Sequence, residues 1–203
     1  MLGYEGVLGL EQSKAGARDN PEHHTTLPFT RMLAGPMDYT PGAFRNVTRE
    51  EFVPRMEMPM VQGTRAHQLA MFAVYQAAFQ MVADWPKAYE NDPSFQFIKD
   101  VPATWDETRV LNGKPGEFVT IARRSGKNWF LGSMTNWDAR EVDVPLDFLG
   151  NGSYSAEIYA DAADADTRPQ SIHMEKLGVD GKSHLHAKLA PGGGYAVRFV
   201  PKR

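Results

Sequence analysis

The pattern of hydrophobic and polar residues divides the chain into two unlike parts. Residues 64–84 are apolar at most positions, and Thr64 can cap a helix that Pro86 stops. Because apolar side chains lie nearly all round this predicted helix, it must be covered on more than one side. We expect a sheet beneath it and a second domain alongside.

From about residue 108 onward, short segments with alternating polar and apolar residues follow one another, separated by turn residues. Val142 and Val144, for example, alternate with acidic residues, which predicts one wet face and one dry face. The predicted strands are 108–111, 117–123, 128–135, 141–148, 154–160, 171–176, 184–189 and 195–200. Such a series is typical of an antiparallel β-sandwich.

Residues 1–63 show neither a helical nor a strand period. Proline and glycine mark turns at 20–21, 35–36 and 40–42, and apolar residues between these turns indicate ordered loops over a core. Long ordered loops are usually functional. This part of the chain is therefore the first place to expect functional residues.

Glu5 and Glu11 occur in a segment punctuated by Gly3, Gly6 and Gly9. In an extended strand the two glutamates would be roughly 20 Å apart, too far to share a ligand. The glycines permit backbone angles by which the chain can fold back and aim both carboxylates at one point. That is the geometry of a hard-cation site or an acid/base site, although glutamates in a glycine-rich segment are more often solvated loop residues.

Composition excludes several kinds of function. The chain of 203 residues has no cysteine, so disulfides, thiolate catalysis and zinc–thiolate sites are excluded. Its formal net charge of -3 provides no basic stripe for a nucleic acid. The sequence contains no signal-like N-terminal region and no apolar run long enough to span a bilayer. We therefore expect neither a nucleic acid nor a membrane as partner.

Other polar and aromatic groups have ordinary structural explanations. His23 and His24 could supply a ligand or carry a proton, but adjacent side chains rarely converge on one atom, so hydrogen bonding is expected instead. The acidic run 161–166 lacks the glycine and distal glutamate of a calcium loop and is predicted to be a solvated turn. Trp129 and Trp137 could stack on a sugar ring, yet buried tryptophans are commoner in sandwiches.

The segment 22–44 reads Glu-His-His-Thr-Thr-Leu-Pro-Phe-Thr-Arg-Met-Leu-Ala-Gly-Pro-Met-Asp-Tyr-Thr-Pro-Gly-Ala-Phe. Together with the preceding segment 4–11, it closely resembles the C-terminal part of the catalytic barrel of glycoside hydrolase family 97. That family contains calcium-dependent bacterial α-glucosidases and α-galactosidases, which have a large N-terminal β-sandwich, a (β/α)8 barrel and a C-terminal sandwich. The resemblance is strongest over residues 1 to about 100.

The resemblance implies an α+β chain with two domains. Residues 1–104 would be the C-terminal end of the (β/α)8 barrel, and residues 105–203 would be the antiparallel β-sandwich. The implied partners are an oligosaccharide or α-glycoside substrate and the missing N-terminal and barrel portion of the same enzyme. The family's proteins are periplasmic or secreted, whereas this chain carries no signal.

Two glutamates acquire roles from the resemblance. Glu11 matches the general acid that protonates the leaving glycosidic oxygen and that also lies in the calcium sphere, and Glu5 matches a calcium ligand. The implied reaction is hydrolysis of an α-glycosidic bond through an oxocarbenium-like transition state flanked by two carboxyl groups. The second carboxylate and the other calcium ligands precede residue 1 in the family's order. The isolated chain is therefore expected to be inert.

Two other functional classes remain open at this point. The chain could be a carbohydrate-binding module, which exposed and aligned Trp129 and Trp137 would favour. It could instead be a structural fragment that self-associates through an apolar patch near Phe29, Met32 and the 64–84 helix. Glucoside or galactoside preference, and inversion or retention of configuration, do not follow from the sequence.

Overall fold

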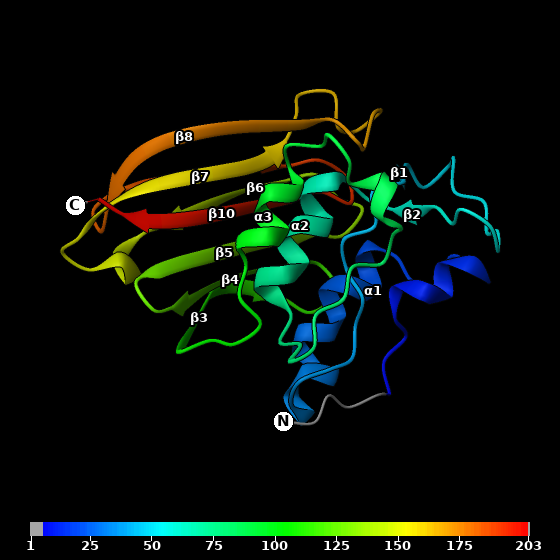
Figure 1. Cartoon of the computed structure of the whole chain (residues 1–203), viewed down its shortest axis with the longest axis horizontal. Helices are drawn as coiled ribbons and strands as arrows, with labels where there is room; N and C mark the ends of the chain where they lie inside the picture. Colours follow the sequence, from blue (N-terminus) through cyan, green and yellow to red (C-terminus); the bar gives the residue numbers. More distant parts are fainter. Residues whose placement is uncertain (1–5, 203) are drawn as a thin grey trace.

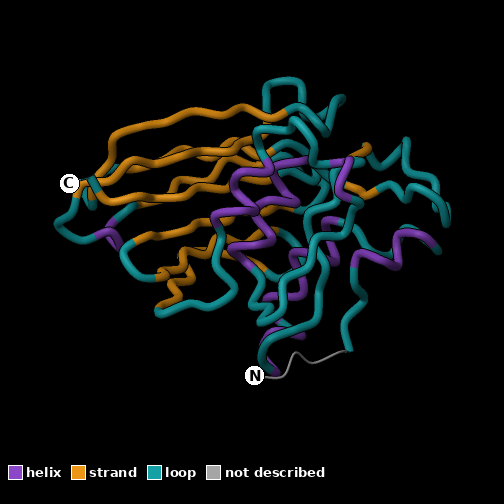
Figure 2. The backbone as a smooth tube through the Cα atoms, in the orientation of Figure 1, coloured by secondary structure: helices purple, strands orange, loops and turns teal. Residues whose placement is uncertain are grey.

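Antiparallel β-strands make up most of the regular secondary structure, and the described part contains three short α-helices (Figures 1 and 2). The computed structural model describes residues 6–202. The helices are α1 (Pro21–Thr26), α2 (Arg65–Val74) and α3 (Phe95–Asp100), and single turns of 3-10 helix are η1 (Leu10–Lys14), η2 (Leu27–Phe29), η3 (Arg31–Ala34), η4 (Pro86–Ala88) and η5 (Asp147–Leu149). None of the helices within this range is long and apolar enough to cross a membrane.

All eight strands predicted in the second part of the chain are present. They are β3 (Glu107–Lys114), β4 (Phe118–Ser125), β5 (Asn128–Thr135), β6 (Arg140–Pro145), β7 (Ser153–Asp161), β8 (Ile172–Asp180), β9 (His184–Leu189) and β10 (Gly194–Pro201). Six of them form one antiparallel sheet in the order β3-β4-β5-β10-β7-β8, and β6 pairs with β9 in a separate ribbon. The predicted strand 141–148 ends early, at Pro145, because the chain turns into η5.

Both faces of the six-stranded sheet are covered. In β5, Phe130 and Met134 belong to the apolar cluster that contains α2, whereas Trp129 and Leu131 belong to a second cluster on the opposite face with β6 and β9. This follows from the alternation of side chains along a strand. On β6, Val142 is buried and the acidic residues beside it are exposed, so the predicted wet and dry faces are confirmed there.

Helix α2 begins where the sequence predicts but is shorter than the predicted 64–84 helix. The Thr64 side chain accepts a hydrogen bond from the His67 N–H at its N-terminus. The helix ends at Val74, whose carbonyl accepts a hydrogen bond from Arg123 at 2.9 Å. All ten of its residues are buried. The predicted sheet beneath it is confirmed, because α2 lies across β5 and β10 (Figure 1).

The second half of the predicted helix is not helical, and lies alongside residues 37–41. The Met37 N–H donates to the Gln76 carbonyl at 3.0 Å, and the Ala83 N–H donates to the Pro41 carbonyl at 3.0 Å. These bonds between distant segments use backbone groups that a longer helix would have paired internally. Tertiary hydrogen bonding therefore overrides a local helix propensity, which is a weak preference.

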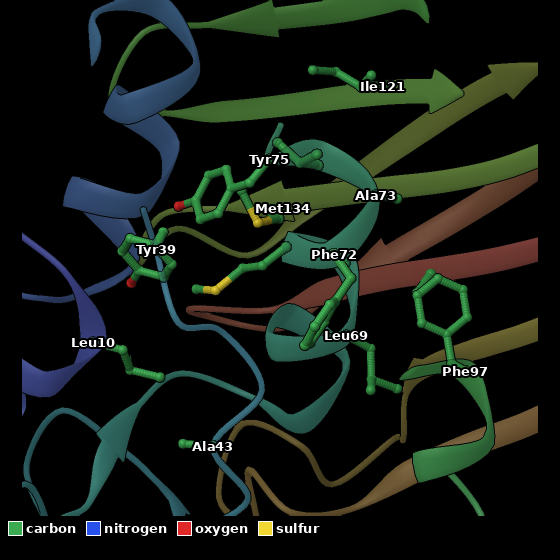
Figure 3. Close-up of a cluster of buried hydrophobic side chains, with 14 of the residues drawn as sticks. Leu10, Tyr39, Ala43, Leu69, Phe72, Ala73, Tyr75, Phe97, Ile121 and Met134 are labelled. Carbon is green, nitrogen blue, oxygen red and sulfur yellow. The ribbon is translucent and has the colours of Figure 1, made fainter. Parts of the chain in front are cut away.

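The first part of the chain and the sheet share one core. Leu69 and Phe72 of α2 lie in the same cluster as Ile121 and Met134 of the sheet, as Figure 3 shows. In the N-terminal part, β1 (Asn46–Val47) and β2 (Val61–Gln62) form a small parallel pair. The division of the chain into 1–104 and 105–203 stays a prediction.

Candidate functional site

Glu11 lies in the first turn of η1 and is exposed. The Thr40 hydroxyl donates a hydrogen bond to its Oε2 at 3.4 Å. Both residues line a small cavity of about 50 Å³, which Val61 and Ala83 also line. The carboxylate therefore stands where η1, the segment before β1, the start of β2 and the 76–83 segment meet.

Two glycines shape the backbone around this glutamate. Gly6 has a φ of +84°, a conformation that residues with a side chain rarely adopt. A Cβ on Gly9 would lie 2.4 Å from Oε2 of Glu11, so the carboxylate occupies the space that a side chain at position 9 would need. The Glu11 carboxylate is thus turned back over Gly9. The fold-back that would aim Glu5 and Glu11 at one point stays a prediction. Gly3 and Glu5 lie outside the described residues.

The described part of the chain does not by itself form a metal site. Within residues 6–202, no three His, Asp or Glu side chains are grouped so that they could hold a metal ion. Calcium takes six to eight oxygen ligands, of which Glu11 could supply one or two. The pairing of Glu5 with Glu11 around calcium stays a prediction.

A buried chain of polar side chains lies behind this surface. The Asp19 Oδ1 is 3.0 Å from Nε2 of His24, and it also accepts a hydrogen bond from the Tyr39 hydroxyl at 3.0 Å. Nδ1 of His24 is 3.0 Å from Nε2 of His67. Nδ1 of His67 is 2.9 Å from the carbonyl oxygen of Gly193 in the β9–β10 turn. Asp19, His24 and His67 are fully buried or nearly so.

Burial displaces the protonation equilibria of this chain. It raises the pKa of the Asp19 carboxyl to about 7, although the Tyr39 hydrogen bond and the charge of His23 act in the opposite direction. It lowers the pKa of His24 well below the ordinary value and that of His67 to about 3. The neutral forms of all three groups are therefore favoured.

The sequence contained a signal for part of this arrangement. Asn20 caps α1, its side chain accepting from the Glu22 and His23 N–H groups, and Pro21 takes the first helical position. The turn predicted at residues 20–21 is therefore the start of a helix. The hydrogen-bonding role expected for the two histidines is confirmed, since the His23 Nε2 donates to the Leu8 carbonyl at 2.9 Å. His67 and Gly193 were missed, because residues so far from His24 give no local pattern.

The remaining candidates have structural surroundings. Trp129 is only 4% exposed and lies in the second apolar cluster. Trp137 is half-buried, with the Arg49 guanidinium 5.6 Å from its ring. In the acidic run, Asp161 is not solvated as predicted: its Oδ2 accepts from the backbone N–H groups of Ala190 and Gly194. The two tryptophans therefore do not form an exposed, aligned pair.

Comparison with known proteins supports the resemblance seen in the sequence. Residues 104–200 match the family described as "Glycosyl-hydrolase 97 C-terminal, oligomerisation". A solved structure of a glycoside hydrolase family 97 enzyme from Pseudoalteromonas sp. strain K8, in complex with panose, is similar over 98% of this chain and 31% of its own, with a TM-score of 0.89 and 38% identity. The chain belongs to glycoside hydrolase family 97.

Two curated relatives have longer sequences than this chain. The retaining alpha-galactosidase of Bacteroides thetaiotaomicron is 41% identical over 204 residues, which cover 98% of this chain and 30% of the relative. A probable retaining alpha-galactosidase of Streptomyces bingchenggensis is 34% identical over 194 residues, or 95% of this chain and 27% of the relative. The chain thus spans less than a third of the length of these two relatives.

Proposed function

We propose that this chain is the C-terminal part of a glycoside hydrolase that cleaves α-glycosidic bonds, with Glu11 as the general acid. The position of Glu11 carries the proposal: an exposed carboxyl group, bent back over Gly9 and bonded to Thr40, at a meeting point of several segments. Among α-glycosides, an α-galactoside is the first substrate to test, because both curated relatives are named alpha-galactosidases.

The surroundings of Glu11 support placing it at the end of a barrel. The parallel pair β1–β2 is an arrangement found among the strands of a (β/α)8 barrel. Active sites of such barrels lie at the carboxyl ends of the strands. We therefore assign the first 104 residues to the end of a catalytic barrel and the remainder to its C-terminal sandwich.

The proposed mechanism uses Glu11 twice. In the first step its carboxyl group gives a proton to the glycosidic oxygen as the bond to the anomeric carbon breaks and a second carboxylate attacks that carbon. In the second step the Glu11 carboxylate takes a proton from the water that displaces this carboxylate. The result is retention of configuration, in keeping with the names of the relatives. The second carboxylate would come from the longer protein.

The proposal includes a bound calcium ion with a structural and an electrostatic role. When bound, it would stabilise negative charge next to the reacting bond. Glu11 fits as one oxygen ligand, Glu5 is the expected second, and the described residues do not complete the coordination sphere. We also place the longer protein in the periplasm or outside the cell, as the family resemblance implies.

The alternative of a carbohydrate-binding module has no support from the tryptophans, since Trp129 is buried. Self-association, however, has a specific observation in its favour. Large apolar side chains are exposed at Leu33 (80%), Phe79 (71%) and Trp85 (52%), in the part assigned to the barrel. We propose that the rest of the barrel covers this surface in the longer protein. In the isolated chain, two copies would associate through the same surface.

The test of the function is a chimaera in which residues 1–203 replace the matching C-terminal segment of the B. thetaiotaomicron enzyme. Glu11→Gln should lower kcat/KM on a disaccharide such as melibiose by about 10²–10⁴, because the leaving sugar needs a proton. The same variant should lose far less on dinitrophenyl α-galactoside, whose leaving group needs none. The isolated chain should show no turnover with either substrate.

Glu22→Gln is the matched control, since Glu22 is an exposed glutamate in α1 of the same segment. It should leave both rates unchanged. Equal losses on the two substrates in Glu11→Gln would rule out the general-acid role. Removal of calcium with EDTA should abolish activity in the chimaera, and calcium alone should restore it; activity that persists in EDTA would contradict the calcium assignment.

A further inference from the structure

The buried chain from Asp19 to Gly193 contains three contacts that each need one hydrogen. They join the Gly193 carbonyl to His67, His67 to His24, and His24 to Asp19, at 2.9, 3.0 and 3.0 Å. A carbonyl oxygen can only accept, so the first hydrogen must sit on Nδ1 of His67. The second and third must lie between the two rings and between His24 and the carboxyl group.

Counting protons gives the net charge of the buried chain formed by Asp19, His24 and His67. Two neutral imidazoles bring one proton each, which leaves one of the three contacts without a hydrogen if Asp19 is ionised. Two lone pairs would then face each other at 3.0 Å in a site without solvent, a costly arrangement. One additional proton, on Asp19 or on either ring, satisfies all three contacts and makes the chain neutral. A second additional proton would either place two hydrogens in one contact or sit on Oδ2 of Asp19, outside the three contacts, and in both cases it would give the buried chain a positive charge.

We propose that a single shared proton satisfies all three contacts of this buried chain. The completed chain is a clasp, which fixes the Glu11-bearing segment to α2 and to the β9–β10 turn. His24 and Asp19 are positioning residues in this scheme, since neither touches a substrate. The importance of the clasp for catalysis rests on the proposed role of Glu11. The proton itself can be observed without any enzymatic activity, so the two proposals can fail separately.

The connections at each end of the chain support a clasp. His23, next to His24 in α1, holds the Leu8 carbonyl upstream of Glu11, while Asp19 lies downstream of it. At the other end, the Thr64 N–H donates to the Gly192 carbonyl at 2.9 Å. Hydrogen bonds thus hold the chain on both sides of Glu11. Helix α2, to which they connect, packs on the sheet.

Because Asp19, His24 and His67 are buried, the number of protons that they hold can be followed as the pH changes. The groups that face it are His23 from α1, Tyr39 from the segment before β1, Tyr75 from the end of α2, Gln62 from β2 and, through Tyr39, Glu11. The Tyr39 hydroxyl donates to Asp19, and the Tyr75 hydroxyl donates to the His24 carbonyl, so neither supplies the shared proton. The raised pKa of Asp19 points to its carboxyl group as the place where the proton resides longest.

NMR of the 203-residue chain tests the count directly. Ring ¹⁵N shifts of His24 and His67 and the ¹³Cγ shift of Asp19 report where each proton lies. At pH 6 we expect three protons over the three groups, with His67 carrying one on Nδ1. Two neutral rings together with an ionised Asp19 at pH 6 would overturn the proposal. A uniform transition as the pH rises above about 7 is expected when the shared proton leaves.

Asp19→Asn tests whether the shared proton, rather than the Asp19 carboxylate alone, holds the segment. The asparagine N–H donates permanently to His24, so the ring signals should become independent of pH between 5 and 9. At pH 9 the Gln12 N–H, which donates to the Gly9 carbonyl beside Glu11, should exchange with solvent several-fold more slowly than in the unmodified chain. Equal exchange rates would show that the proton does not hold the segment. Asp143→Asn, which alters an exposed carboxylate between His184 and His186, should change neither readout.

Discussion

At the scale of single residues, burial decides what each acidic group does. Glu11 is exposed at the surface cavity, whereas Asp19 and the Oδ1 atom of Asp161 are buried. Burial raises the pKa of both aspartates to about 7. One acid is therefore available for chemistry, and the other two hold neighbouring segments together.

Asp161 gives a prediction about stability against pH. Its carboxyl group has a pKa of about 7 in the folded chain, mainly through burial, and 3.8 in the unfolded chain. The folded state binds the additional proton, so this group stabilises the fold below pH 3.8 and loses that contribution as the pH rises through 7. Asp161→Asn should remove this loss, on the order of a few kcal/mol, in urea unfolding followed from pH 4 to pH 8.

The control for Asp161→Asn is Asp166→Asn, since Asp166 is an exposed residue of the loop that follows β7. Its unfolding free energy should follow that of the unmodified chain at every pH. If the Asp161 and Asp166 variants showed the same pH dependence, the raised pKa of Asp161 would be wrong.

At the scale of elements, α2 is the piece that joins the two parts of the molecule. It contacts β4, β5, β7 and β10 on one side and α3 on another. Close approach to the sheet depends on glycine, because a Cβ on Gly132 of β5 would lie 2.4 Å from the Ala70 carbonyl oxygen. A Cβ on Gly194 would lie 2.3 Å from the backbone of His67. These two contacts fix how closely the helix lies on the sheet.

Gly132→Ala should therefore lower the free energy of unfolding by about 1–3 kcal/mol, the usual cost of overpacking a core. Urea unfolding monitored by tryptophan fluorescence measures it. Gly16→Ala is the matched control, since no atom lies within 4 Å of the added methyl group, and it should change stability by less than about 0.5 kcal/mol. Similar costs at the two positions would mean that α2 does not touch the sheet at Gly132.

At the scale of the whole molecule, the sheet is covered on both faces while the N-terminal part is not covered on all sides. The ribbon β6–β9 covers one face, and α2 and α3 cover the other (Figures 1 and 2). The exposed apolar residues are Leu33 in η3 and Phe79 and Trp85 between α2 and η4, all in the part that we assign to the barrel. Unbalanced exposure of this kind is typical of an interaction surface.

The isolated chain should therefore self-associate reversibly in sedimentation experiments at micromolar concentration. Phe79→Ser should weaken this association severalfold, because it removes an apolar ring that is 71% exposed. Val110→Ser is the control, since Val110 is 65% exposed on strand β3 at the edge of the sheet. A monomer at all concentrations, or equal effects of the two variants, would contradict this use of the surface.

Local patterns predicted the regular elements well and the site only partly. The eight strands could be predicted because alternation and turn residues are properties of neighbouring positions. The length of α2 could not, since Val74 ends the helix by bonding to Arg123, a residue of β4. Asn20 followed by Pro21 did carry a helix-start signal, so that miss came from interpreting a cap as a turn.

The sequence by itself determined the strand pattern, and membership of family 97 through a long matching run. Tertiary structure alone decided which polar groups are buried together: Asp19, His24, His67 and the Gly193 carbonyl come from four separate segments. The physical reason is range. Propensity and periodicity act between neighbours, whereas hydrogen bonds in a buried site depend on which distant segments the folded core brings within 3 Å.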